Sequence, residues 1–408
     1  MGYVGLPTAL ALVESGSSVI GYDISEARLA AIKTGAVDLA PADQARLEHH
    51  LGSDPFVLTT NPAVLASVDT VMVCVPTPID PHFTPDLTAL SSACETVIKY
   101  AVPHQLIILT STTYVGATRQ LLVEPLSAHG FEIGKDVFVA FSPERIDPGN
   151  ASFDHSAVPR VIGAVTKACQ DRAVAMLERV TSAVHPVSSP EAAEITKLLE
   201  NSFRAVNIAL VNEFAEVCGY WGLDVIEVIE AAATKPFGFM PFYPGPGVGG
   251  HCIPCDPHYL LWQLRARRAR LPVTEAAMTA IALRPRLIVD RARQVLADSG
   301  HTLSGARVLV AGVTYKPGVS DLRGSPALEI MVALQQEGAE VAFTDPLVGS
   351  VHLAGREVAG VTDAHEQSWD LVVVHTQHPG ADYSWLSRHP RVLDTTYRAT
   401  YIPARLLP

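Results

Sequence analysis

The stretch from Pro244 to Pro257 constrains this chain more than any other, because its composition excludes both a helix and a central strand. It contains four glycines and four prolines. Glycine carries a large backbone entropy cost in regular structure, and proline lacks a backbone donor. We therefore predict a loop that ends at Asp256, where a helix begins. Asp caps free N–H groups, and Pro257 fits the first helical turn.

Cys252 stands directly before this predicted helix. The positive end of a helix dipole, together with glycines that admit a ligand close to the backbone, suits a reactive thiolate. A single cysteine is more often a small buried hydrophobe. The spacing Cys252-x-x-Cys255 also fits half a zinc site or a redox pair, but the sequence has no second Cys-x-x-Cys and no His-x(3–5)-His run to complete four ligands. No metal is predicted.

The spacing Gly247-x-Gly249-Gly250-x-Cys252-x-x-x-Asp256 resembles the active-site signature of the UDP-glucose/GDP-mannose dehydrogenase family. Members of this family are nucleotide-sugar 6-dehydrogenases. The resemblance implies that Cys252 is the nucleophile, that Asp256 helps a water molecule hydrolyse a thioester, and that Gly249 contacts the sugar. It also implies NAD as the cofactor and a UDP-sugar as the substrate.

Length and composition are consistent with such an enzyme. A chain of 408 residues with 48% hydrophobic and 18% charged residues is expected to fold into two or three domains. Its formal charge of −12 argues against general nucleic-acid binding. Six scattered cysteines suggest reduced thiols and a cytoplasmic location. No apolar run reaches the roughly 18 residues that span a bilayer, so no membrane association is expected.

The first residues match the second half of a dinucleotide-binding fingerprint. Gly2-x-x-Gly5 precedes an Ala/Leu-rich helix, an apolar strand follows, and Asp23 stands about 20 residues on. By resemblance Asp23 binds the adenosine ribose, which favours NAD over NADP; the alternative is a solvated aspartate at a strand end. The resemblance also assigns Val4 and Arg28 to the cofactor site.

Two further strands deliver polar residues to the edge where doubly wound sheets bind their ligands. The strand 70–75 ends at Pro76-Thr77-Pro78, and the strand 106–109 leads into hydroxyl residues that include Thr112. The family has the same Val-Pro-Thr-Pro run. The resemblance implies that Thr77 contacts the cofactor, and that Thr112 contacts it and also positions the catalytic water. The alternative for these hydroxyls is a helix cap.

A third strand, 137–141, is followed by Pro143, Glu144 and Arg145. A carboxylate in this loop faces the same edge of the sheet, and loops at such edges commonly carry function. The resemblance implies that Glu144 acts as a general acid and base in the thioester steps and contacts substrate. The strands 159–163 and 184–187 are then expected to complete the first domain.

A long amphipathic helix is predicted from Pro190 to Tyr220, because apolar residues recur at helical spacing. Lys197 and Asn201 are four residues apart and so share one face. The family has Glu-x-x-Lys-x-x-x-Asn here. The resemblance implies that both side chains contact the reacting sugar and stabilise a developing oxyanion, and that the helix forms a dimer core. A solvated Lys and a neutral Asn are the alternatives.

The last part of the chain begins a new alternating α/β pattern at Val308, after a central helix of about 274–298 that we expect to break near Pro285. It carries Gly312-Val313-Thr314-Tyr315-Lys316-Pro317 and then Asp321-x-Arg323. The resemblance implies that Lys316 contacts the UDP-sugar and that Arg323 lies beside the nicotinamide. Either cation could instead form a structural salt bridge.

These segments predict an α/β fold with two Rossmann-like, doubly wound domains joined by a central all-helical region. The expected domains are an NAD-binding domain (1–188), a central helical dimerisation domain that carries the Cys loop (189–299), and a UDP-sugar-binding domain (300–408). We expect a homodimer or higher homo-oligomer.

Local motifs narrow the expected reaction. His251-Cys252-Ile253-Pro254 and the residues around Asn201 look most like the UDP-N-acetylhexosamine branch, nearest to UDP-N-acetylglucosamine 6-dehydrogenases. The implied reaction is a four-electron oxidation at C6 through a thiohemiacetal and a thioester on Cys252. UDP-N-acetylmannosamine and UDP-glucose stay open as substrates. A nucleotide-sugar-binding homologue without activity and a two-electron alcohol dehydrogenase are the other classes.

The start of the chain leads to one more expectation. The family fingerprint has a buried strand and a first glycine before Tyr3-Val4-Gly5, and neither is present before Met1. We expect the first sheet to lack the strand that should lie between the strands 19–22 and 71–75, and the chain to be a truncated or mis-started form.

Overall fold

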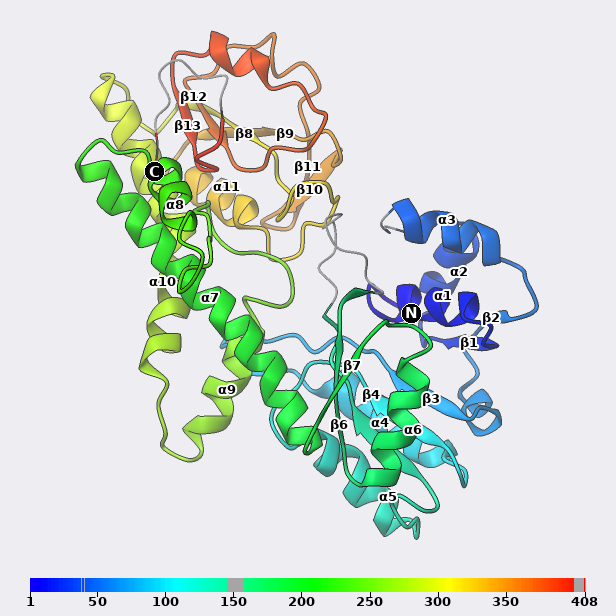
Figure 1. The fold of residues 1–408 in the computed structure, drawn as a ribbon. Coiled ribbons are helices and arrows are strands. Elements are labelled where there is room, and N and C mark those ends of the chain that lie inside the picture. The colour runs from blue at the N-terminus through cyan, green and yellow to red at the C-terminus, as the bar shows by residue number, and fades with distance from the viewer. Residues whose placement is uncertain (38, 40, 146–156, 400–406, 408) are drawn as a thin grey trace. The chain divides into compact units, whose positions relative to one another are not determined.

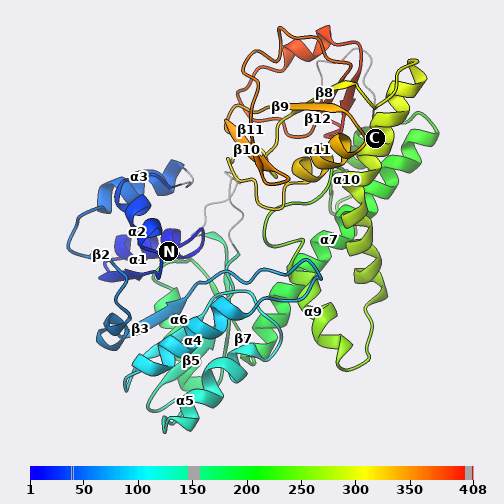
Figure 2. The ribbon, with the colours of Figure 1, turned by 180° about the vertical axis from the view of Figure 1, so that it is seen from behind.

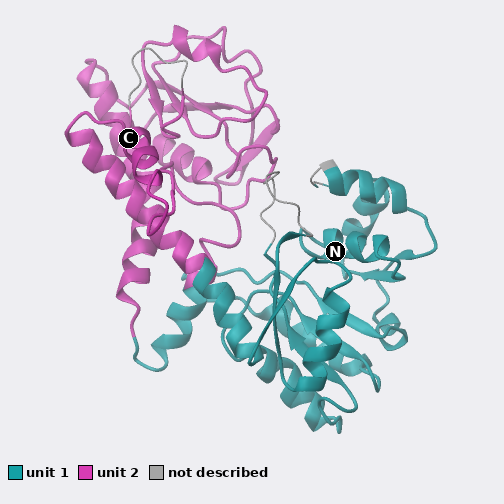
Figure 3. Cartoon of the chain, viewed as in Figure 1, with its two compact units in different colours: residues 1–200, 258–269 teal, residues 201–257, 270–408 magenta. Residues whose placement is uncertain are grey.

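The computed structural model describes residues 1–37, 39, 41–145, 157–399 and 407, and it divides the chain into two compact units (Figures 1 and 3). Unit 1 comprises residues 1–200 and 258–269, and unit 2 comprises residues 201–257 and 270–408. Two of the three boundaries fall inside helices, α7 (Pro190–Tyr220) and α9 (Asp256–Arg265), and the third lies between α9 and the next helix, α10 (Pro272–Asp298).

Unit 1 is an α/β unit whose strands belong to two sheets. A five-stranded sheet has the order β3-β4-β5-β6-β7, parallel except for the β5/β6 pair, and a separate parallel pair is formed by β1 and β2. Besides parts of α7 and α9, the elements are α1 (Gly5–Glu14), β1 (Val19–Tyr22), α2 (Glu26–Lys33), α3 (Pro41–His50), β2 (Phe56–Thr59), η1 (Pro62–Ser67), β3 (Thr70–Val73), α4 (Thr88–Tyr100), β4 (Leu106–Leu109), η2 (Arg119–Val123), α5 (Glu124–Ala128), β5 (Phe138–Phe141), β6 (Arg160–Ala164), α6 (Lys167–Leu177) and β7 (Val184–Val187).

The five-stranded sheet is buried on both faces, because successive strand residues point to opposite sides. Ile107 and Leu109 of β4 pack in one apolar cluster with α4 and α5, whereas Leu106 and Ile108 pack in another with α6. All four residues are at most 4% exposed. The three helices are labelled in Figure 2. Near-continuous apolar strands of this kind are typical of parallel sheets covered by helices.

The gap expected in the first sheet is present. β1 pairs with β2 and β3 pairs with β4, and within the described residues no strand joins β1 to β3. The edge of each strand that faces away from its partner is therefore left without a ladder neighbour.

Unit 2 contains the rest of α7 and a second doubly wound sheet of four parallel strands in the order β13-β12-β8-β9. The strand order reverses between β8 and β12, which is the place where ligands bind in such sheets. Its elements, apart from those shared with unit 1, are α8 (Val225–Ala233), α10 (Pro272–Asp298), β8 (Arg307–Ala311), α11 (Pro326–Gln336), β9 (Glu340–Thr344), β10 (Ser350–Leu353), β11 (Arg356–Ala359), β12 (Leu371–Val374), η4 (Ser384–Arg388) and β13 (Val392–Asp394).

The expectation that the helix after Arg270 breaks near Pro285 is wrong. α10 is continuous from Pro272 to Asp298 with Pro285 inside it. Pro costs a helix interior about 3 kcal/mol through its missing donor and its steric clash. Here Pro285 lies in a row of buried residues with Ile281 and Ile288, and Arg284 bonds to Glu216 of α7. Tertiary packing on this face offsets the local cost. Among the described residues, no helix is both long and apolar enough to cross a bilayer.

Candidate active site

The first turn of α1 forms one end of the candidate cofactor site. The Leu6 N–H donates to the Gly2 carbonyl (3.0 Å), so the helical turn starts at Gly2. A Cβ placed on Gly2 would meet nothing within 4 Å, whereas one on Gly5 would lie 3.5 Å from the Cβ of Cys74. The free N–H groups of a helix N-terminus favour a pyrophosphate, and open space at Gly2 allows one to approach the backbone. These residues fit a dinucleotide.

Asp23 follows β1 directly, as predicted, and the structure places it beside two other groups. Its Oδ2 lies 2.6 Å from the ammonium group of Met1, and its Oδ1 accepts from the Ser25 N–H (2.9 Å). Arg28 Nε donates to the Met1 carbonyl (2.8 Å). Asp23 is thus not a solvated strand end, and the predicted cofactor residues Asp23 and Arg28 both lie beside Met1.

The loops with Thr77 and Thr112 are held together by a residue that the sequence interpretation did not single out. Ser111 Oγ accepts from the Val75 N–H and donates to the Val75 carbonyl, both at 2.8 Å. Tyr259 of α9 donates its hydroxyl to the Thr77 carbonyl (3.1 Å) and is fully buried. The loops after β3 and β4 are therefore fixed side by side, and Thr112 is half-buried in the second.

Glu194, also not predicted, anchors the Lys197 part of α7. It is 1% exposed, and it accepts hydrogen bonds from the Gly116 N–H (2.5 Å), the Thr118 N–H (2.9 Å) and the Thr118 hydroxyl (2.7 Å). Burial raises its pKa, although these hydrogen bonds oppose the shift. One turn further on, Lys197 is buried as well. The signal in the sequence was the family spacing Glu-x-x-Lys.

Glu144 lies at the carboxyl end of β5 and forms a buried ion pair. Its Oε2 is 2.6 Å from Arg160 Nη1, and its Oε1 accepts from the Arg145 N–H (2.8 Å). Arg145 in turn forms an ion pair with Glu200 on α7 (2.6 Å). The pKa of Cys74 is raised to about 11, first by burial and then by the negative charge of Glu144. Glu144 is thus a fixed carboxylate near the end of β3.

In unit 2, Asn201 and Asp256 meet. Asn201 Nδ2 donates to Asp256 Oδ2, and both side chains are 3% exposed. Asn201 comes from α7, and Asp256 is the first residue of α9, as the sequence predicted. The hydrogen bond fixes the orientation of the carboxylate, which is what a group that activates water requires.

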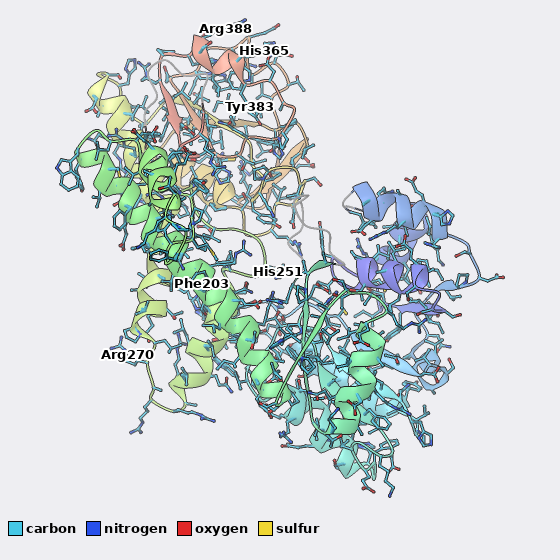
Figure 4. The ribbon with its side chains drawn as sticks, in the orientation of Figure 1. Phe203, His251, Arg270, His365, Tyr383 and Arg388 are labelled. Atoms are coloured by element: carbon cyan, nitrogen blue, oxygen red, sulfur yellow. The ribbon has the colours of Figure 1, made fainter. Side chains whose placement is uncertain are left out.

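We call residues 244–255 the thiol loop, on which Figure 4 labels His251. Cys252 is exposed and its carbonyl accepts from the N–H groups of Cys255 (3.2 Å) and Asp256 (2.8 Å), so it lies in the turn that begins α9. Burial lowers the pKa of His251, and Arg323 adds to this shift.

Glycines dock the thiol loop against the loop that follows β8. A Cβ on Gly249 would lie 2.6 Å from Tyr315 and 2.7 Å from the Gly324 carbonyl, so no other residue fits. The Gly250 N–H donates to the Arg323 carbonyl (2.9 Å). The structure thereby brings two motifs that are 60 or more residues apart in the sequence, the Cys252 loop and the Arg323 loop, into contact within one unit.

Arg323 forms the salt bridge that was the alternative interpretation. Its Nη2 lies 2.6 Å from Asp321 Oδ2, and its Nε also donates to this carboxylate (3.0 Å). The two hydrogen bonds to Asp321 fix the orientation of the Arg323 guanidinium. The side chain stays 44% exposed, so the ion pair does not bury it.

The loop that contains Lys316 is held by hydrogen bonds to a buried histidine, His378. His378 Nδ1 accepts from the Gly318 N–H (3.1 Å), and its Nε2 lies 3.2 Å from Thr314 Oγ1 and 3.3 Å from Asp345 Oδ2. Nδ1 must be unprotonated to accept, so Nε2 carries the proton. Asp345 also accepts from the Val313 N–H (2.8 Å). These contacts were not visible in the sequence, because His378 follows a different strand.

Comparison with known proteins identifies the whole arrangement. Residues 1–181 match the NAD binding domain of the UDP-glucose/GDP-mannose dehydrogenase family, residues 191–280 its central domain, and residues 309–399 its UDP binding domain. The chain belongs to this family. It is an NAD-dependent UDP-sugar dehydrogenase.

Relatives with assigned names cover almost the whole chain. The UDP-N-acetyl-D-glucosamine 6-dehydrogenase of Pseudomonas aeruginosa is 34% identical over 93% of this chain and 89% of its own length. The UDP-N-acetyl-D-mannosamine dehydrogenase of Pyrococcus horikoshii is 33% identical over 97% and 93%. A solved structure of the UDP-D-ManNAc dehydrogenase of the same organism is similar with a TM-score of 0.90, 30% identity, and coverage of 100% of this chain and 96% of the other. The fold predicted from the sequence is confirmed.

Proposed function

We propose that this dehydrogenase carries out a four-electron oxidation of the C6 hydroxyl of a UDP-N-acetylhexosamine to the carboxylate, with UDP-N-acetylglucosamine as its preferred substrate. The observation that supports this most is the buried Asn201–Asp256 hydrogen bond at the start of the helix that follows Cys252. An oriented carboxylate next to a thiol loop is needed for thioester hydrolysis and is superfluous for a simple alcohol oxidation.

The first oxidation removes two electrons and two protons from the C6 alcohol and leaves an aldehyde. Lys197 and Asn201, four residues apart on α7, would stabilise the negative charge that develops on the sugar oxygen. Lys197 is buried, and an ammonium in such surroundings acts more strongly than in water. Thr112 would hold the water molecule through which the alcohol proton leaves.

The second oxidation depends on Cys252. Its thiolate would add to the aldehyde carbon to give a thiohemiacetal, which loses a hydride to become a thioester. The position of Cys252 at the N-terminal turn of α9 favours an anionic sulfur. Water, activated by Asp256 and Glu144, would then cleave the thioester, releasing the carboxylate and returning the thiol.

The cofactor residues follow from the site. Gly2, Val4 and Gly5 at α1 would hold the pyrophosphate, and Asp23, assisted by Arg28, would hold the ribose hydroxyls. Thr77 and Arg323 would complete the NAD contacts. NAD, when bound, accepts one hydride in each of the two oxidations. Because the chemistry combines NAD with a reactive thiol, we place the enzyme in the cytoplasm.

The substrate assignment rests on the resemblance of the residues around Cys252 and Asn201 to the UDP-N-acetylhexosamine branch, and on relatives named for N-acetylated sugars. Lys316 and Gly249 would contact the UDP-sugar. The test is NADH formation with UDP-N-acetylglucosamine, UDP-N-acetylmannosamine and UDP-glucose. We expect two NADH per uronate and the highest kcat/KM for UDP-N-acetylglucosamine. One NADH per sugar, with the aldehyde released, would indicate a two-electron dehydrogenase. If no UDP-sugar gives NADH, the protein would be a nucleotide-sugar-binding homologue without activity.

The second part of the proposal is a homodimer formed through α7. Along its unit 2 part, Phe203, Leu210, Phe214 and Val217 recur at intervals of seven, four and three residues, and each is 39–52% exposed. Figure 4 labels the first of them on the helix. This spacing places them on one stripe. A stripe of large exposed apolar side chains on a helix suits a symmetric partner. Sedimentation of the wild type and of Phe214→Glu tests this, with a dimer and a monomer expected.

A further inference from the structure

We infer that Cys252 is an oxidation site, and that Cys255 is its resolving partner, so that a hydroperoxide converts the pair into a disulfide and switches the enzyme off reversibly. This inference rests on the proposed function of Cys252 as nucleophile. It adds a role for Cys255, for which the proposed reaction has no use.

The first observation is the difference in exposure between the two thiols. Cys252 is exposed, whereas Cys255 is 9% exposed. A peroxide in solution therefore reaches Cys252 first, and the N-terminal dipole of α9 favours the thiolate that reacts with it. Accessible, activated cysteines next to a second thiol are the usual redox-sensing arrangement.

The second observation is the turn that joins the two residues. The Cys255 N–H donates to the Cys252 carbonyl (3.2 Å), and the following Asp256 N–H donates to the same oxygen (2.8 Å). A turn closed in this way keeps the two Cα atoms within about 7 Å, and helical neighbours three residues apart have Cβ atoms about 5–6 Å apart. Disulfides need Cβ atoms at about 3.5–4.5 Å. On these ranges the two Cβ atoms have to approach each other by about 0.5–2.5 Å.

The third observation concerns the other cysteine of unit 2. Cys218 is 4% exposed and lies in an apolar cluster with Val211 and Ala215 of α7 and with Val225 and Ile229 of α8. It is enclosed, so it does not compete as a partner within the unit. Its position makes Cys218→Ala a matched control for loss of a buried thiol.

The chemistry balances in two steps. The Cys252 thiolate attacks the hydroperoxide, forms a sulfenic acid and releases hydroxide, or an alkoxide when the peroxide is organic. The Cys255 thiol then displaces the sulfenic hydroxyl, so that an S–S bond forms and one water molecule leaves. A dithiol reductant reverses this state. Without Cys255, further peroxide takes the sulfenic acid to the sulfinic acid, which such reductants do not reverse.

The test compares the wild type, Cys255→Ala, Cys255→Val and Cys218→Ala after titration with hydrogen peroxide. Remaining thiols are alkylated, and the peptide that contains both cysteines is examined by mass spectrometry before and after dithiothreitol. Before dithiothreitol, we expect a wild-type peptide in which neither thiol is alkylated and two hydrogens are lost. After dithiothreitol, we expect the wild type to recover most of its activity. The Cys255 variants should start near wild-type activity and lose it to peroxide at a similar rate. After dithiothreitol, the activity that they recover should be roughly tenfold less than that of the wild type. Cys218→Ala should behave as the wild type.

The outcomes separate this inference from the proposed function. Peptide mapping needs no turnover, so it tests the oxidation site independently of the reaction. If the wild type forms the 252–255 disulfide but Cys252→Ala keeps its dehydrogenase activity, Cys252 is an oxidation site and is not the nucleophile. An alkylated Cys255 in peroxide-treated wild type, a disulfide to another cysteine, or equal recovery of the Cys255 variants would overturn the inference.

Discussion

Glu144 and Arg160 form an ion pair of 2.6 Å in which each side chain is only 10% exposed. Removing one member of such a pair leaves a buried charge without its partner, which typically costs about 3–5 kcal/mol, whereas replacing both members is often neutral. The pair therefore fixes the position of the Glu144 carboxylate at the end of β5.

Arg160→Met is expected to lower stability by about 3–5 kcal/mol, because it leaves the Glu144 carboxylate buried without its partner. Arg160→Met/Glu144→Gln should regain much of the stability. Urea unfolding of the two single variants and the double variant measures the coupling. If the two single effects simply add in the double variant, the ion pair does not hold Glu144.

Asp256→Asn should stop the reaction after the second oxidation. We expect kcat to fall by about 10²–10⁴, the range for loss of a general base, and a uronyl thioester to accumulate on Cys252. Asn at position 256 still accepts from Asn201, so folding is expected to be kept. Mass spectrometry of the acid-quenched enzyme detects the adduct. Asp363→Asn, the same change at an exposed position, is the matched control. Loss of activity without an adduct would remove Asp256 from thioester hydrolysis.

His378 offers a pair of substitutions that separate its two nitrogen atoms. Asn places an oxygen near the position of Nδ1 and keeps the acceptor for the Gly318 N–H, whereas Gln keeps a donor near Nε2 and loses that acceptor. An unsatisfied Gly318 N–H should loosen the Lys316 loop. We expect His378→Gln to raise the KM for the UDP-sugar about tenfold, and His378→Asn to stay close to the wild type. The KM for NAD is the internal control; equal changes in both KM values would mean general damage to the fold.

The sequence predicts helices and strand ends well, because these depend on local pattern. The helix from Pro190 to Tyr220 and the start of α9 at Asp256 have the predicted bounds. Side-chain partners were not predicted, since they depend on which strands become neighbours. Arg160 meets Glu144 because β6 pairs antiparallel with β5, and no local pattern indicates that pairing. The continuous helix through Pro285 was missed for the same reason, because tertiary packing outweighed a local rule.

The same limit applies to His258, whose environment gives the last prediction. His258 is 8% exposed and stacks on Phe83 with 4.6 Å between ring centroids. Burial, with a further contribution from the positive charge of Arg265, lowers its pKa from 6.5 to about 4. The unfolded chain therefore binds a proton at this position between pH 6.5 and pH 4 that the folded chain does not bind.

A group with a lowered pKa in the folded state stabilises the fold above its unfolded pKa, and this contribution is lost as pH falls. A lowering from 6.5 to about 4 corresponds to roughly 3 kcal/mol. His258→Phe keeps a ring against Phe83 but does not titrate. We expect the stability of the wild type relative to this variant to be constant above pH 6.5, to fall between pH 6.5 and pH 4, and to level off below. Urea midpoints of both proteins across this range measure the difference. A difference that does not change with pH would mean that His258 titrates in the folded protein as it does in the unfolded chain.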